Sequence, residues 1–238
     1  MKTWLKWLTV PALSLAMTLP ALAREDDDLS ELQNKLGNEW VLVKNDRLHS
    51  VKTYVKQEDA KRYRSFKVEA VFEGSMDALM RVIMDFDHYG RWSWNVLESK
   101  LLKKVSPTEY IMYVVHDSPY GVPDRDIVLK MTIEPQTPSR PYITFRFNAM
   151  PDYIPEKPPY VRMQAEDMVA RFTPMGDGKF LVTNEGYVDP GGKMAPWAIN
   201  FVSRNAPYIT LLGMRRMMSN DEYVNAKTPL PFAVSSKP

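Results

Sequence analysis

Between residues 97 and 190 the sequence repeatedly alternates apolar and polar residues, and only one long helical segment follows. A period of two is typical of strands that bury one face. The clearest examples are segments 126–134, 142–150, 160–174 and 179–190. A sheet with one apolar face needs a partner layer, and the segment after residue 191 is long enough to cover it. The sequence therefore predicts an α+β fold in which a curved antiparallel sheet wraps around a long C-terminal helix.

This last segment, 191–214, carries a proline inside its helical pattern. Pro196 falls at the first turn, where a proline is tolerated. Apolar residues then recur near the helical period at Ala198, Val202, Ala206, Ile209 and Gly213. Pro207 lies within this stripe and must kink or break the helix, at a cost of about 3 kcal/mol if uncompensated. A single helix often cannot fill the space inside a long curved sheet, and an unfilled apolar space is a ligand cavity.

The other elements point to one domain. Segment 64–73 places Phe66, Val68, Ala70 and Phe72 on one face of a strand. Ser75 is an N-cap candidate for the helix that follows, whose apolar face is formed by Met76, Leu79, Met80, Ile83 and Met84. We expect an acidic lead-in helix over 24–36, one domain over 37–222 and a flexible tail over 223–238.

The chain opens with the features of a secretory signal peptide. Lys2 and Lys6 give a positive start, residues 7–19 are largely apolar, and Ala21-Leu22-Ala23 is a small-residue cleavage site. This order predicts a signal peptide over 1–23, cleaved after Ala23, and export. An uncleaved membrane anchor is the alternative, although the apolar stretch is short and the segment contains two prolines.

Composition narrows the functional classes. Without Lys2 and Lys6 the chain has 29 basic and 29 acidic side chains, which gives no electrostatic basis for nucleic-acid binding. The absence of cysteine excludes disulfides, thiolate catalysis, cysteine metal sites and a cysteine-linked lipid anchor. We therefore expect a soluble monomer in the periplasm of a Gram-negative bacterium, held together by its core alone.

Several stretches between residues 37 and 218 resemble one known family when taken in order. They are "GNEWVLVKNDRLHSVKTYVK", "ALMRVIMDFDHYGRWSWNVLESKLL", "DSPYGVPDRDIVLK", "PYVRM" and "YVDPGGKMAPWAINFVSRNAP". Together they resemble the START domain, the StAR-related lipid-transfer family. In order, they are similar to its opening strand pair, its first internal helix, its proline loop with an Arg–Asp pair, its xVIR strand, and its Asp-Pro-Gly-Gly turn with the lid helix. The resemblance implies a helix-grip fold with a hydrophobic cavity, which binds and carries one lipid without catalysis.

The resemblance also bears on the kind of lipid. The proline within the last helix is similar to that of phosphatidylcholine-transfer members. Cholesterol-binding members place a buried acid and a buried arginine on neighbouring strands, and the positions that align here are Met112 or Tyr113 and Met131. Because neither charge is present, a phospholipid is favoured over a sterol.

Candidate site residues follow from the predicted faces and the resemblance. Those expected to contact the lipid are Met112, Met131, Phe145, Phe147, Met163, Ile199, Val202, Ala206 and Ile209. Arg125, Asp126 and Arg162 are the polar or headgroup candidates, and Arg146 is a weaker one. A buried salt bridge is the alternative for Arg125 and Asp126. Pro207 is expected to act as a lid hinge that lets the second half of the helix bend away, or else only to curve the helix around the sheet.

Transient membrane contact would involve aromatic residues near the mouth of the cavity. Trp197 and Tyr208 on the helix, with Tyr153 and Ile154 in the loop "MPDYIPEKPP", could sit in the bilayer interface, where aromatic rings are favoured. Packing inside the protein would explain them equally well.

Two other classes of function remain open. An enzyme would need a positioned acid, base or nucleophile, and the chain has only His49, His88 and His116. Asp85 and His88 could suggest a metal site, but a solvated helix end explains them better. Residues 116–118 have triad residue types, but as sequence neighbours they have the wrong arrangement. We expect no catalysis, metal or cofactor. A passive lipid sensor is the second alternative.

Overall fold

The computed structural model of the protein describes residues 38–235 and residue 237. Its strands are β1 (Val41–Asp46), β2 (Val51–Lys56), β3 (Ser65–Glu73), β4 (Val96–Ser106), β5 (Glu109–His116), β6 (Arg125–Glu134), β7 (Ile143–Ala149), β8 (Val161–Arg162), β9 (Ala165–Gly176) and β10 (Lys179–Asp189). The helices are α2 (Met76–Met84), the 3-10 helix η1 (Phe86–Arg91), α3 (Pro196–Met217) and α4 (Asp221–Val224). The predicted signal peptide 1–23 and lead-in helix 24–36 lie outside the described residues.

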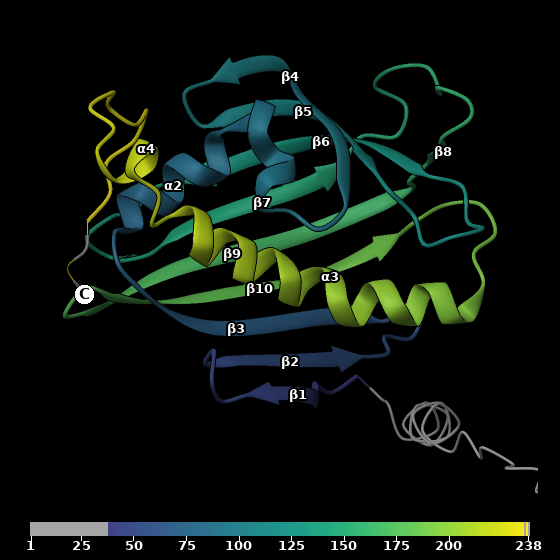
Figure 1. Cartoon of the computed structure of the whole chain (residues 1–238), viewed down its shortest axis with the longest axis horizontal. Coiled ribbons are helices and arrows are strands. Elements are labelled where there is room, and N and C mark those ends of the chain that lie inside the picture. The colour runs from purple at the N-terminus through teal and green to yellow at the C-terminus, as the bar shows by residue number, and fades with distance from the viewer. Residues whose placement is uncertain (1–37, 236, 238) are drawn as a thin grey trace, which may run out of the picture. The chain divides into compact units, whose positions relative to one another are not determined.

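One sheet organises these elements. Its strand order is β1-β2-β3-β10-β9-β7-β6-β5-β4, with β8 added beside β6. Neighbours along this path are antiparallel, whereas β8 is parallel to β6. Figure 1 shows α3 crossing one face of the sheet, with α2 on the same side. The predicted α+β fold, a curved antiparallel sheet with a long C-terminal helix, is confirmed, and the sheet is open.

The period-two pattern places the core on the helix-covered face. On β3 the predicted residues Phe66, Val68, Ala70 and Phe72 are all buried. The alternation is less complete on β6, where Val128 on the predicted polar face is also buried. It joins a second, smaller cluster with Ile111, Tyr113 and Val115, against which Leu102, Met150, Ile154 and Tyr160 pack. The loop after β7 therefore covers part of the opposite face, which a strand pattern alone cannot show.

Local signals fix the ends of the helices. Ser75 caps α2 as predicted, and its Oγ accepts a hydrogen bond from the Ala78 backbone N–H at 3.1 Å. The turn before α3 requires glycine at position 191, because its φ is +68° and a Cβ there would overlap the Arg162 carbonyl oxygen.

Within the described residues, no helix combines the length and hydrophobicity that a bilayer span requires.

Helix α3 continues through Pro207 without interruption. In Figure 1 its two halves run in different directions, so the helix bends and does not break. Pro207 has no N–H to give to the Ser203 carbonyl, which accounts for a bend at this level.

The two halves of α3 are attached very differently. Beyond Pro207 the buried residues are Leu211, Gly213, Met214 and Met217. A Cβ at Gly213 would overlap the Trp92 backbone, so the helix lies directly on that segment. The first half buries Ala198 but exposes Trp197, Phe201 and Arg204. The expectation that the second half would bend away therefore conflicts with the packing, which fixes that half to the core.

The segment after α3 also differs from its prediction. We expected a flexible tail over 223–238, but the described part packs on the domain. The Tyr223 hydroxyl donates to Asp85 Oδ2 at 2.8 Å, and the Phe232 ring lies 6.3 Å from that of Phe145. Leu230 and Val234 also pack against the core. The apolar residues of "TPLPFAV" have no periodicity, so sequence patterning gave no signal for this contact.

Candidate functional site

A pocket of about 170 Å³ lies between the sheet and α3. Its walls come from β3, β6, β9, β10, α3 and the segments that follow η1 and β5. The apolar part of the lining is formed by Phe66, Trp94, Pro119, Met163, Met168, Val188, Pro190, Met194, Ile199, Val202, Ala206 and Pro207. The polar part is formed by Arg64, Tyr89, Ser93, His116, Asp117, Ser118, Arg125, Glu166, Asn184, Ser203 and Thr210. Apolar and polar residues thus contribute to the lining in nearly equal number, and most of the surface that faces the pocket is apolar.

Four of the nine predicted lipid contacts line this pocket: Met163, Ile199, Val202 and Ala206. Arg125 and Pro207 line it as well. The remaining five apolar candidates do not line the pocket. Met112, Met131, Phe145 and Phe147 are buried in the main core, and Ile209 is 42% exposed on α3.

The four buried candidates miss the pocket because of where they lie along their strands. Alternation correctly predicted that they face the helix-covered side of the sheet, but that side is filled where they lie. The Phe232 ring contacts the Phe145 ring there, and α2 contributes Leu79 and Met80 to the same core. For Ile209 the cause is rotation, because the pocket side of α3 centres on Val202, Ala206 and Thr210.

Asp126 and Arg162 form a buried salt bridge between the adjacent strands β6 and β8. Arg162 Nη2 lies 2.8 Å from Asp126 Oδ2 and Arg162 Nε lies 3.0 Å from Oδ1, with both side chains almost fully buried. The Tyr113 hydroxyl donates to Asp126 Oδ2 at 3.1 Å. Arg162 also donates to the carbonyls of Ile154 and Pro155 at 3.0 and 3.2 Å.

Neither residue of this bridge lines the pocket, so the structure does not support Asp126 or Arg162 as a headgroup contact. The bridge instead holds the loop 151–160 against the sheet. The alternative, a buried salt bridge for Arg125 and Asp126, holds for Asp126, which pairs with Arg162, whereas Arg125 forms no ion pair among the described residues. Arg146, the weaker headgroup candidate, pairs with Glu134 at 2.5 Å and does not line the pocket.

Arg125 is the member of the predicted trio that lines the pocket. Its side chain is 3% exposed, and its Nη1 donates to the Pro123 carbonyl. Its Nε and Nη2 atoms are buried and have no hydrogen-bond partner among the described residues. Burial lowers the pKa of the guanidinium, although arginine stays protonated in proteins.

The polar lining contains groups that the sequence analysis did not name. Glu166 is buried, and burial, followed by the charge of Asp167, raises the pKa of its carboxyl to about 7. Burial also raises the pKa of Tyr89, with a further contribution from Glu166. The alternation of "AEDMVARF" puts Glu166 on the same face as Met168 and could have revealed it.

Two of the histidines, His116 and His88, lie in very different surroundings. Burial lowers the pKa of His116 to about 4, so its ring is neutral at physiological pH. His88 is largely exposed and contacts Asp85 at 2.9 Å next to the end of α2, in agreement with a solvated helix terminus. Within the described part of the chain, no three His, Cys, Asp or Glu side chains are grouped so that they could hold a metal ion.

A curved open sheet that carries a long C-terminal helix over an apolar pocket defines a helix-grip protein. The START domain matches residues 22–219, and the chain belongs to this family. An uncharacterized protein of Pseudomonas aeruginosa is 26% identical over 182 residues, which cover 76% of this chain and 88% of that protein.

Two solved structures illustrate the similarity. A STAR-related lipid transfer protein from Xanthomonas axonopodis superposes with a TM-score of 0.69 at 28% identity, over 76% of this chain and 99% of the other. Human StAR-related lipid transfer protein 5 gives a TM-score of 0.67 at 13% identity, over 82% and 95% of the two chains, and shares the fold alone.

Proposed function

We propose that this protein binds one lipid in the pocket beneath α3 and carries it between membranes after export to the periplasm. The observation that carries the proposal is the largely apolar pocket under the C-terminal helix of a START domain. The N-terminal sequence pattern supports export. Absence of the acid–arginine pair at Met112 or Tyr113 and at Met131, all fully buried, supports a phospholipid rather than a sterol.

A carrier is needed because lipids leave membranes slowly. Each CH₂ exposed to water costs about 0.8 kcal/mol, so two chains of about 16 carbons cost on the order of 25 kcal/mol. A protein interior that replaces the bilayer removes most of this barrier. The methionines of the pocket, Met163, Met168 and Met194, suit acyl chains of different shape because their side chains are flexible.

The size of the pocket implies that α3 moves when a lipid enters. A volume of 170 Å³ is below the range of about 300–1,000 Å³ that is usual for pockets of small ligands. A two-chain lipid therefore needs more room than this conformation provides. We infer that the first half of α3 gives way, because Trp197, Phe201 and Arg204 on it are exposed, whereas the half beyond Pro207 is anchored.

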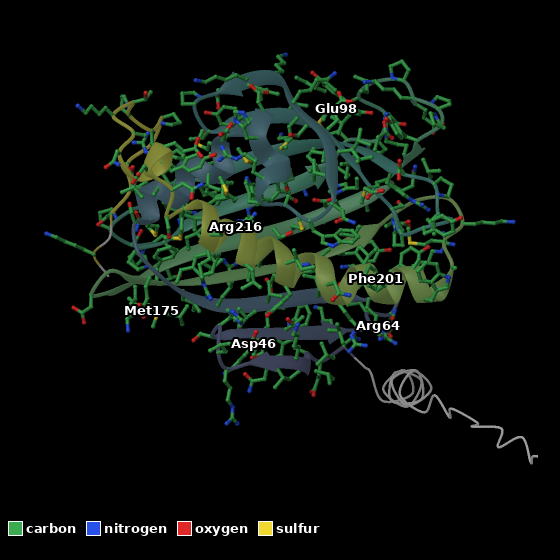
Figure 2. All side chains as sticks on the ribbon, viewed as in Figure 1. Asp46, Arg64, Glu98, Met175, Phe201 and Arg216 are labelled. Carbon is green, nitrogen blue, oxygen red and sulfur yellow. The ribbon has the colours of Figure 1, made fainter. Side chains whose placement is uncertain are left out.

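The same half of α3 is the proposed membrane contact. Trp197 is 55% and Phe201 48% exposed, and Figure 2 shows Phe201 on this part of the helix. Exposed aromatic rings favour the bilayer interface. Tyr208 does not fit this role as expected, since its hydroxyl donates to Asp46 Oδ2 at 2.5 Å. Of the two loop candidates, Ile154 packs against the second, smaller cluster around Tyr113, whereas Tyr153 is 40% exposed.

A vesicle assay tests the function. Donor vesicles that contain a fluorescent phospholipid and a quencher are mixed with unlabelled acceptor vesicles and the purified protein. A carrier raises the transfer rate in proportion to protein concentration. A protein that takes up one lipid per chain but leaves the rate unchanged is a sensor. If no lipid is taken up, lipid binding itself is refuted and an enzyme becomes the leading alternative.

The hinge proposal predicts a slower carrier when Pro207 is replaced. Pro207→Ala restores the N–H that can donate to the Ser203 carbonyl, and this should straighten and stiffen α3. We expect transfer to slow by about three- to tenfold, while the amount of bound lipid at equilibrium changes little. Rates are measured in the vesicle assay, with Pro229→Ala in the C-terminal segment as the matched control. An unchanged rate would leave Pro207 with only a shaping role.

A further inference from the structure

Arg125 places free hydrogen-bond donors inside an apolar pocket. Its Nη1 donates to the Pro123 carbonyl, but Nε and Nη2 have no partner among the described residues. Arg125 is nonetheless only 3% exposed. Unpaired donors of a buried guanidinium are costly, so such a group calls for an acceptor. Because the side chain lines the pocket, the acceptor can come from a ligand.

No carboxylate in the described part of the chain lies within ion-pair distance of this guanidinium, although Asp117 and Glu166 also line the pocket. Asp126, the next residue, is held by Arg162 at 2.8 Å. Asp124 accepts the Ser118 backbone N–H at 3.0 Å and forms no ion pair with Arg125 within the described residues. Glu166 lines the same pocket, but its raised pKa of about 7 leaves it less negative at neutral pH than an ordinary glutamate.

A second arginine adds positive charge to this region, and a tyrosine adds another buried hydroxyl. Arg64, which precedes β3 and is labelled in Figure 2, also lines the pocket, and burial lowers the pKa of its guanidinium. The Tyr63 hydroxyl is buried without a partner among the described residues. Burial raises the pKa of this hydroxyl, and the charges of Arg62 and, more weakly, Arg125 oppose the rise.

We infer that Arg125 binds the oxyanion of a lipid headgroup, either a carboxylate or a phosphate, and so selects anionic over neutral lipids. The inference rests on the proposed function. A guanidinium fork matches both oxyanions in geometry and charge. The apolar remainder of the pocket accommodates acyl chain, which assigns the anion to a lipid and not to a free ion.

The test compares ligands that share their chains and differ in the headgroup. Oleate is paired with oleyl alcohol, and dioleoyl phosphatidic acid with dioleoylglycerol, while inorganic phosphate alone is the probe for a free ion. Dissociation constants are measured by quenching of tryptophan fluorescence, since Trp94 lines the pocket. We expect the anionic member of at least one pair to bind about tenfold or more tightly than its neutral partner.

Two variants assign the preference to Arg125. Arg125→Met should abolish it, and Arg125→Lys should keep part of it because the charge remains. Arg146→Met, on the surface of β7, should leave it intact. Thermal melts establish that each variant is folded, and the wild-type preference is a test that needs no variant.

Three results would overturn the inference. One is equal binding of anionic and neutral partners by the wild type, and another is a preference that survives in a folded Arg125→Met variant. The third is inorganic phosphate binding as tightly as phosphatidic acid, which would refute the assignment to a lipid headgroup. Failure of all lipids to bind is a separate outcome, because it refutes the proposed function together with this inference.

Discussion

Replacing Ala206 with tryptophan should abolish lipid binding and leave the fold intact. Ala206 is half-buried on α3 and lines the pocket of about 170 Å³. A cavity of about 150 Å³ holds one benzene molecule, so the larger indole would fill nearly all of this space. We expect binding of a fluorescent phospholipid to weaken by at least about thirtyfold, which corresponds to about 2 kcal/mol.

Ile209→Trp is the matched control for this variant. The same side chain is added one turn further along α3, where Ile209 is 42% exposed and does not line the pocket. Lipid binding should stay within about threefold of the wild type. Sequence periodicity assigned both Ala206 and Ile209 to the lipid, whereas only Ala206 lines the pocket. The two variants therefore test whether periodicity or the pocket predicts the lipid contacts. Equal loss in both variants, or normal binding by Ala206→Trp, would place the lipid elsewhere.

The second large effect concerns stability. Asp126→Ala should lower the free energy of unfolding by about 3–5 kcal/mol, because it leaves the Arg162 guanidinium buried without its charge partner. The side chains of the pair are 0% and 2% exposed, and Asp126 also accepts from Tyr113. Urea unfolding followed by tryptophan fluorescence measures the loss.

An exposed ion pair provides the comparison. Glu73→Ala removes the partner of Lys179 at 3.2 Å, where the side chains are 73% and 50% exposed, and should cost less than about 1 kcal/mol. Adding Arg162→Met to Asp126→Ala should recover part of the loss, since no unpaired charge is then buried. A loss below about 1 kcal/mol for Asp126→Ala, or no recovery in the double variant, would contradict this account of the bridge.

The bridge also shows what separates the two neighbouring residues Arg125 and Asp126. They are adjacent on β6, so their side chains point to opposite faces of the sheet. Asp126 meets Arg162 and the outer loop, whereas Arg125 turns to the pocket. Adjacent in sequence, the two residues suggested one shared role, and strand geometry assigns them different ones.

Much of the fold could be predicted from local patterns. The alternation in β3 and in the second half of β6, the Ser75 cap and the first-turn proline of α3 each depend on residues close in sequence, and each is found in the structure. The motifs from the Trp-containing strands to the Asp-Pro-Gly-Gly turn were sufficient to recognise the START domain, and the family match confirms it. The four predicted lipid contacts that line the pocket came from the same faces.

The location of the pocket was decided by the tertiary structure. Periodicity gives the direction in which a side chain points, but not what lies opposite it. Phe145 and Met163 both belong to the helix-covered side, yet Phe232 packs against the first and only the second lines the pocket. The pairing of Asp126 with Arg162, the anchored half of α3 and the free donors of Arg125 likewise depend on segments distant in sequence. The sequence by itself determined the elements, their buried faces and the family, whereas the packing of distant segments decided which part of the buried face remained a pocket.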